Sequence, residues 1–173
     1  MDELKGRRVT LVPTVDGHIA ELLRIRDTPQ VRARWGETPE APDWPFDEPE
    51  VTPFTVFVGA EGGPIVGFIQ YGEELTPAYR HASIDIFLDP ALHGQGVGRD
   101  AIWTLAHHLI HERHHHRIVI DPATDNAAAI RCYASVGFRP VGVMRGYERD
   151  ADGGGWHDGL LMDLLADELS AQP

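Results

Sequence analysis

The sequence of 173 residues is poor in several features that mark particular classes of protein. It has a single cysteine, Cys132, so an internal disulfide is impossible and a reducing compartment is expected. No apolar run approaches the length that crosses a bilayer, and residues 1–6 do not resemble a signal peptide. These absences predict a cytoplasmic protein without a membrane partner.

Basic residues are also scarce: 15 lysines and arginines face 27 aspartates and glutamates, giving a formal net charge of −12. Such a charge argues against nucleic acid as a partner and favours the approach of a cationic ligand, although a solvated acidic surface has the same composition. The length suits one domain over residues 1–173. A monomer and a homodimer are equally compatible with it.

Hydrophobic periodicity predicts an alternation of strands and helices. Strands are expected at 8–12, 54–58, 65–69, 83–88, 117–120, 139–145 and 158–165. The strands at 54–58 and 65–69, separated by Gly62-Gly63, are expected to form an antiparallel hairpin. Helices are expected after a Thr14 cap, after Thr28-Pro29, after residue 97, and from an Asp125 cap to about Val136, closed by Gly137. Residues 37–50, with four prolines and six acids, predict a loop, and both a substrate-facing loop and a mobile acidic surface loop are compatible with this composition.

This order predicts an α/β fold. A strand–helix–strand crossover lies mid-chain between antiparallel segments, so we expect a mixed, mostly antiparallel sheet with helices on both faces.

Glycines at 94, 96 and 98 stand between a predicted strand end and a predicted helix start. Without β-carbons, successive N–H groups can converge on one point, and the helix N-terminus adds unpaired donors and partial positive charge. The turn therefore predicts a phosphate cradle. A plain connecting turn and a dinucleotide site remain alternatives, since residues 96–101 also fit G-x-G-x-x-G/A.

Two motifs in order resemble one family. They are Leu88-x-Pro90-x-x-His93-Gly94-x-Gly96-x-Gly98 and, after a short strand, Asn126-x-x-Ala129-x-x-x-Tyr133-x-x-x-Gly137-Phe138. Together they resemble the acetyl-CoA-binding half of the GCN5-related N-acetyltransferase (GNAT) superfamily. Two segments resemble the aminoglycoside 6′-N-acetyltransferases still more closely. They are Ile84-Asp85-x-Phe87-Leu88 and Asp121-Pro122-x-x-x-Asn126, the second of which continues through Ala129 to Tyr133.

The resemblance implies acetyl-CoA as the co-substrate, with its pyrophosphate at the glycine turn and no metal. The implied cofactor-binding residues are Phe87, Leu88, His93, Gly94, Gln95, Gly96, Val97, Gly98, Arg99, Asn126 and Ala129. His93 stands where the family usually has Arg or Gln. Because backbone donors would hold most of the pyrophosphate, we expect at most weaker or pH-dependent affinity.

Asp85 is the candidate base, because a carboxylate inside an apolar strand is costly unless it is solvated or paired. Binding the amine, or accepting a structural hydrogen bond, is its alternative role. The resemblance implies that Tyr133 protonates the leaving thiolate and that the Leu88 N–H polarises the thioester carbonyl. A tyrosine that only packs in the core is the alternative for Tyr133. The resemblance implies that Asp121 binds the substrate amine, although Asp121 could instead simply start the turn before Pro122. Asp85 and Asp158 are the other candidate substrate-binding acids.

Residues 111–115 spell H-E-x-x-H, a zinc-protease motif. Three other histidines lie beside it, at the predicted end of the helix that begins near residue 97. A zinc site needs both histidines on the inner face of a helix and a third ligand. We therefore expect a solvated helix end rather than a metal centre.

The resemblance implies direct acetyl transfer, in a ternary complex, to a primary amine. We expect the acceptor to be a cationic small molecule, with an aminoglycoside and antibiotic resistance as candidates. A peptide or protein N-acetyltransferase and a non-catalytic CoA-binding regulatory module remain the alternatives.

Overall fold

The computed structural model describes residues 2–36 and 44–173. The strands are β1 (Leu4–Lys5), β2 (Val9–Pro13), β3 (Val51–Val58), β4 (Ile65–Glu74), β5 (His81–Leu88), β6 (Arg117–Ile120), β7 (Arg139–Arg149) and β8 (Trp156–Leu165). The helices are α1 (Asp16–Arg26), α2 (Pro29–Trp35), α3 (Val97–His111) and α4 (Ala127–Val136), with short 3-10 helices η1 (Pro90–Leu92) and η2 (Ala166–Glu168).

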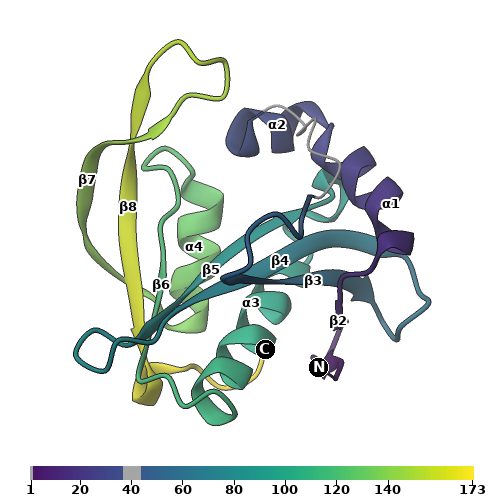
Figure 1. Ribbon diagram of the computed structural model, residues 1–173, viewed down its shortest axis with the longest axis horizontal. Helices are drawn as coiled ribbons and strands as arrows, with labels where there is room; N and C mark the ends of the chain where they lie inside the picture. The colour runs from purple at the N-terminus through teal and green to yellow at the C-terminus, as the bar shows by residue number, and fades with distance from the viewer. Residues whose placement is uncertain (1, 37–43) are drawn as a thin grey trace.

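Within the described residues, the strands form one sheet in the order β1-β2-β3-β4-β5-β6-β8-β7. The pair β5–β6, joined through α3, is parallel, and its neighbours pair antiparallel. Figure 1 shows the sheet twisting between α1 and α2 on one side and α3 and α4 on the other. The predicted mixed sheet with helices on both faces and a central crossover is therefore confirmed.

The two faces of the sheet bury different clusters. On one face, α1 and α2 place Leu22, Ile25 and Val31 against Phe68 and Phe87. On the other, the apolar stripe of α3 packs on alternate strand residues in a larger cluster. The 3.6-residue period of the helices and the two-residue period of the strands account for this division.

Two predicted helix caps are wrong. Val15 is the N-cap of α1, while the Thr14 hydroxyl lies 3.1 Å from the Thr55 hydroxyl in the interior. Asn126, not Asp125, caps α4, accepting the Ala129 N–H at 3.3 Å. In both cases the structure shifts the helix start by one residue relative to the expected cap. Gly137 does end α4, with φ of 125°.

The predicted hairpin at 54–69 is confirmed and is longer than expected, because β3 begins at Val51 and β4 continues to Glu74. The short strand β1 was not predicted. Of the predicted loop at 37–50, residues 37–43 lie outside the described residues. No helix in the described parts of the chain is long and apolar enough to cross a membrane.

The H-E-x-x-H segment does not lie on one helix. Helix α3 ends at His111, and Glu112 is its C-cap. The expectation of a solvated helix end is wrong for His115, which is 1% exposed and whose Nε2 lies 2.7 Å from Glu73 Oε1. Arg113 also contacts the Glu73 carboxylate, at 2.8 Å. This segment thus fastens the chain after α3 to the end of β4.

Candidate active site

The glycine turn between β5 and α3 has the backbone conformation that its sequence predicts. Gly94 and Gly96 have φ of 77° and 81°, in the left-handed region, and Gly96 is the N-cap of α3. Side chains with a β-carbon are strained there. The first amides of α3 have no partner within the helix, so the turn presents donors and the positive end of the helix dipole together.

The third glycine has a packing role. A β-carbon on Gly98 would lie 3.1 Å from Leu88 Cδ1 and 3.7 Å from Cys132 Sγ. Gly98 therefore lets the start of α3 approach both β5 and α4. Burial raises the pKa of the Cys132 thiol, which agrees with a packing role for this cysteine rather than a nucleophilic one.

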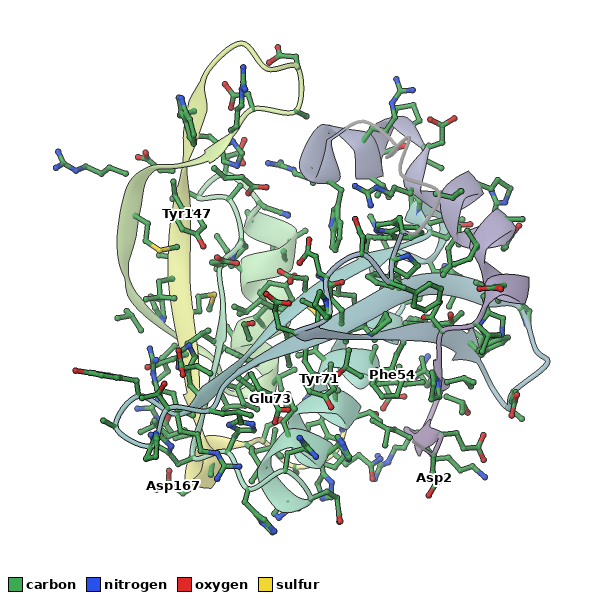
Figure 2. The ribbon with its side chains drawn as sticks, in the orientation of Figure 1. Asp2, Phe54, Tyr71, Glu73, Tyr147 and Asp167 are labelled. Atoms are coloured by element: carbon green, nitrogen blue, oxygen red, sulfur yellow. The ribbon has the colours of Figure 1, made fainter. Side chains whose placement is uncertain are left out.

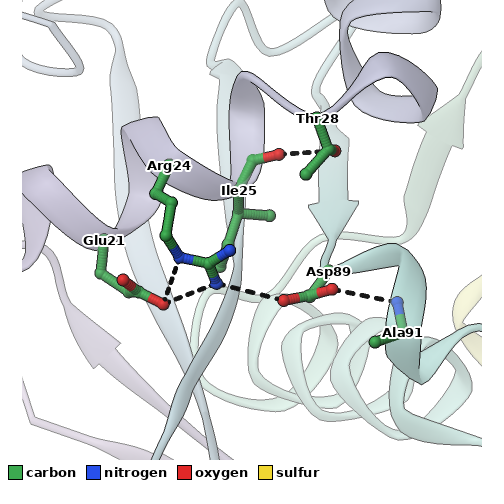
Figure 3. Close-up of polar contacts among 6 residues, drawn as sticks. All are labelled: Glu21, Arg24, Ile25, Thr28, Asp89 and Ala91. Carbon is green, nitrogen blue, oxygen red and sulfur yellow. Dashed lines mark hydrogen bonds and ion pairs between the residues drawn. The ribbon is translucent and has the colours of Figure 1, made fainter.

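Two polar anchors hold the turn from outside the motif. The buried Asp100 carboxylate, in the first turn of α3, accepts the N–H groups of Arg7, Arg8 and Val9 at 3.2, 2.7 and 3.1 Å. On the other side, Arg24 of α1 contacts Asp89, whose carboxylate also accepts the Ala91 N–H at 3.0 Å (Figure 3). The cradle is thus fixed to the N-terminal part of the chain.

Strands β5 and β6 separate as they approach the turn. Their register joins only Ala82 to Ile118 and Ser83 to Val119. The Asp89 N–H donates to the carbonyl oxygen of Val66 in β4, at 2.8 Å. Because amides alternate along an extended chain, the Leu88 N–H faces away from β4, toward the gap beside β6. It is therefore placed to act as a donor there.

A cavity of about 350 Å³ opens beside this gap. It is lined by Arg34, Trp35, Glu48, Gln70, Ile84, Asp85, Ile86, Ile120, Asp121, Pro122, Ala123, Asn126, Tyr133, Glu148 and His157. The candidate base, the candidate acid and one candidate substrate acid, Asp85, Tyr133 and Asp121, therefore meet in one cavity although they come from three separate segments.

Asp85 lies opposite Gln70 in the β4–β5 register, and Gln70 Nε2 donates to its Oδ2 at 3.2 Å. Its pKa is raised, first by burial and further by the carboxylates of Asp121, Glu148 and Glu48, while the bond from Gln70 opposes the shift. A carboxylate with a raised pKa accepts a proton more readily, which suits a general base.

Tyr133 is 8% exposed on α4. Burial raises the pKa of its phenol, and the neighbouring Cys132, Asp85 and Asp121 raise it further. The hydroxyl consequently stays protonated over the working pH range. It can donate a hydrogen bond to a leaving group at every such pH.

Asp158 is not among the residues that line the cavity. Its Oδ1 accepts the Gly146 N–H at 2.7 Å, which places the carboxylate against the backbone of β7. The cavity wall instead contains Glu48 and Glu148, which sequence reasoning missed. Neither lies in a recognisable motif, although Glu48 belongs to the acidic segment 37–50, for which a substrate-facing role was one alternative.

Arg34 and Gln70 were also missed. Gln70 could have been found from the predicted hairpin and the strand at 83–88, had their register been known. Arg34 of α2 contacts Asp125 at 2.6 Å, joining the cavity wall to the residue before the Asn126 cap. Its charge is therefore compensated by a carboxylate outside the cavity.

A parallel strand pair that separates before a glycine turn at a helix start agrees with the expected class of CoA-dependent acyltransferases. Residues 19–138 match the family described as the acetyltransferase (GNAT) family. The chain belongs to this family, and it is an N-acetyltransferase that uses acetyl-CoA.

The chain is similar to acetyltransferases of several kinds. The N-alpha-acetyltransferase RimI of Mycobacterium tuberculosis is 34% identical over 111 residues, which are 61% of this chain and 68% of RimI. The structure of Mycobacterium smegmatis RimJ in complex with CoA-disulfide superposes with a TM-score of 0.84 at 24% identity, covering 99% of this chain and 90% of RimJ. The aminoglycoside acetyltransferase AAC(6')-Ib in complex with coenzyme A gives 0.74 at 22% identity, covering 92% and 96%. The two structures support the fold alone.

Proposed function

We propose that the enzyme acetylates a primary amine of a cationic small molecule, with aminoglycosides among the candidates. The observation that carries this proposal is the charge of the acceptor cavity. Among the described residues that line it, four are carboxylates, Asp85, Asp121, Glu48 and Glu148, and one is an arginine. An acceptor carrying more than one ammonium group complements that wall.

The cofactor side of the site would work through backbone groups. The N–H groups at the turn from Gly94 to Arg99 would hold the pyrophosphate, and bound acetyl-CoA supplies an activated thioester. The Leu88 N–H would donate to the thioester carbonyl oxygen and stabilise the negative charge that develops there.

Asp85 would remove a proton from the acceptor ammonium, directly or through water, because an alkylammonium is almost wholly charged near neutral pH. The neutral nitrogen would then attack the thioester carbonyl carbon, so that a C–N bond forms and the C–S bond breaks. The second proton on the nitrogen would pass to the leaving sulfur, which departs as the thiol, and Asp85 would return its proton to solvent. The leaving thiolate receives a hydrogen bond from Tyr133. Since this phenol is a weaker acid than a thiol, whose pKa is about 8.5, stabilising the thiolate contributes more than complete proton transfer.

A second candidate is acetylation of a peptide N-terminus, which the 34% identity to RimI favours. An acetylation screen read by mass separates the two. Kanamycin, other aminoglycosides, simple polyamines and peptides with free N-termini are each incubated with enzyme and acetyl-CoA. We expect acetylation of polycationic small molecules, and weaker acetylation by Asp121→Asn. Modification of peptides alone would contradict the proposed acceptor.

A further inference from the structure

Gln95, within the glycine turn, makes hydrogen bonds through its amide, its side chain and its carbonyl. Its N–H donates to the Leu92 carbonyl at 3.3 Å, and its side-chain Nε2 donates to the Ala91 carbonyl at 2.8 Å. Its own carbonyl oxygen accepts a hydrogen bond from Arg8 Nη1 at 3.1 Å, across 87 residues of sequence. Gln95 is thus held from two sides, by η1 and by the N-terminal part of the chain.

The start of α3 leaves backbone donors available. The helical ladder begins with the Asp100 N–H, which donates to the Gly96 carbonyl at 3.1 Å. Among the described residues, the N–H groups of residues 96–99 have no backbone acceptor. The Gln95 carbonyl, which a ladder that began one residue earlier would use, accepts from Arg8 instead. These amides are the donors to which the proposed pyrophosphate would bind.

The bond from Arg8 sets the direction of one of these donors. The Gln95 carbonyl and the Gly96 N–H belong to one planar trans peptide unit, in which they point in opposite directions. A donor fixed on the Gln95 oxygen therefore turns the Gly96 N–H away from Arg8. Gly94 and Gly96, with φ of 77° and 81°, place little steric restraint on this peptide unit, so a bond from outside the turn is needed to fix it.

Arg8 is itself held against α3 by its backbone. Its N–H donates to the buried Asp100 carboxylate at 2.7 Å. Gly6 permits this approach, because a β-carbon there would lie 2.5 Å from Asp100 Oδ2 and 2.6 Å from Thr104 Oγ1. At the far end of the side chain, Arg8 Nε would lie 3.9 Å from a β-carbon on Gly96. The guanidinium is therefore placed beside the N-cap of α3.

We propose that Arg8 is a positioning residue of the cofactor site, which fixes the peptide unit between Gln95 and Gly96 so that the Gly96 N–H is ready to bind the pyrophosphate of acetyl-CoA. Arg8 then lowers the cost of ordering the turn when the cofactor binds. It acts on the carbonyl side of the turn, opposite to the Gly96 N–H. This inference rests on the proposed binding of the pyrophosphate by the turn and is independent of the acceptor amine.

The first test measures the Kd for acetyl-CoA by calorimetric titration. Arg8→Ala should weaken binding about tenfold, the size expected when a hydrogen bond from a charged group is lost. Arg8→Lys, which keeps a donor, should recover part of that loss. Arg7→Ala is the matched control, because it removes the same charge from the neighbouring exposed residue, whose side chain makes no polar contact with a described residue. Equal Kd values for Arg7→Ala and Arg8→Ala would overturn the inference.

The second test separates positioning from the attraction of charges. Added salt screens the attraction between an exposed cation and a phosphate, and at about 1 M the screening length is only about 3 Å. The difference in Kd between Arg8→Ala and Arg7→Ala should persist under these conditions, because a hydrogen bond to a carbonyl causes it. A difference that disappears at high salt would assign Arg8 to charge attraction and overturn the positioning role.

The third test needs no cofactor. NMR relaxation of the backbone amides in the cofactor-free protein reports the picosecond-to-nanosecond motion of the Gly96 N–H. In Arg8→Ala its order parameter should fall from about 0.85, typical of rigid backbone, toward the flexible range below about 0.6. Arg7→Ala should leave it unchanged. An order parameter that stays at the wild-type value in Arg8→Ala would overturn the inference.

The outcomes distinguish this inference from the proposed cofactor site, because Gly96→Val tests the turn itself. If Gly96→Val weakens acetyl-CoA binding on folded protein and Arg8→Ala does not, the turn holds the cofactor and the positioning role fails. If neither substitution weakens binding, the proposed cofactor site is wrong and the positioning role fails with it.

Discussion

The two sides of the active site are built by different means. In the proposed site, the cofactor side would use backbone amides presented by a continuous glycine turn, whose conformation is set by Gly94 and Gly96. The acceptor side would use carboxylates from four distant parts of the chain, Glu48, Asp85, Asp121 and Glu148, which line one cavity. The difference teaches that a backbone site is encoded locally, whereas a side-chain site depends on the register of the sheet and on loops that the sheet holds.

The largest expected effect comes from the acceptor side. Asp85→Asn should lower kcat about a hundredfold, since a positioned general base contributes about 10²–10⁴-fold. The base must be deprotonated, and its pKa is raised by burial and neighbouring carboxylates. The wild-type rate should therefore rise with pH through that raised pKa, and the variant should lack this rise. The pH profile of kcat/KM measures it.

Asp163→Asn is the control for this substitution, because Asp163 of β8 pairs with Arg117 instead of lining the cavity. An equal loss of rate at every pH in Asp85→Asn would assign Asp85 to amine binding and remove it as the base.

The next largest effect is expected on the cofactor side. Gly96→Val should weaken acetyl-CoA binding about thirtyfold, because φ of 81° is strained for a β-branched residue and several backbone donors would move. Calorimetric titration with acetyl-CoA, on protein shown to be folded, measures the change. Gly142→Val is the control, since its added β-carbon meets no atom within 4 Å. Equal affinities in the two variants would mean that the turn does not hold the cofactor.

A smaller effect is expected at the boundary between the two sides. Tyr133→Phe should lower kcat about tenfold and leave the Kd for acetyl-CoA within about twofold, because only a hydrogen bond to the leaving thiolate is lost. The control is Tyr71→Phe, a buried tyrosine that stacks near Phe54 in the sheet (Figure 2). Under conditions where chemistry limits the rate, an unaltered kcat would show that Tyr133 does not stabilise the leaving thiolate.

The smallest effect is expected at His93, and it tests whether backbone groups provide most of the affinity for acetyl-CoA. His93 is exposed, and His93→Arg should tighten acetyl-CoA binding by about threefold at most, in line with the modest energy of exposed charge pairs. The gain should shrink as salt is added. Titrations at two ionic strengths measure it. A tenfold or larger gain would show that side chains, rather than amides, carry much of the affinity.

Local patterns account for most of the secondary structure. Apolar periodicity placed the long elements, and the glycines marked the turn and the end of α4, because each of these depends on residues close in sequence. The predicted caps Thr14 and Asp125 each lie one residue before the observed N-caps, Val15 and Asn126. A polar side chain near a helix start can bond either to the first helical amides or to another group, and the Thr14 hydroxyl bonds to the hydroxyl of Thr55, which is 41 residues away in the sequence.

The sequence by itself determined the α/β fold and the glycine turn through short periods and local backbone freedom, and Asp85 as a candidate because a carboxylate in an apolar strand is costly. Tyr133 became a candidate through the family resemblance. Only the tertiary structure decided that Asp121 joins them, that Glu48 and Glu148 complete the cavity, and that Asp158 faces the backbone of β7. Those contacts depend on which strands are neighbours, on a bulge at Gly146 and on the separation of β5 from β6. All three are fixed by packing and hydrogen bonding between segments far apart in the chain.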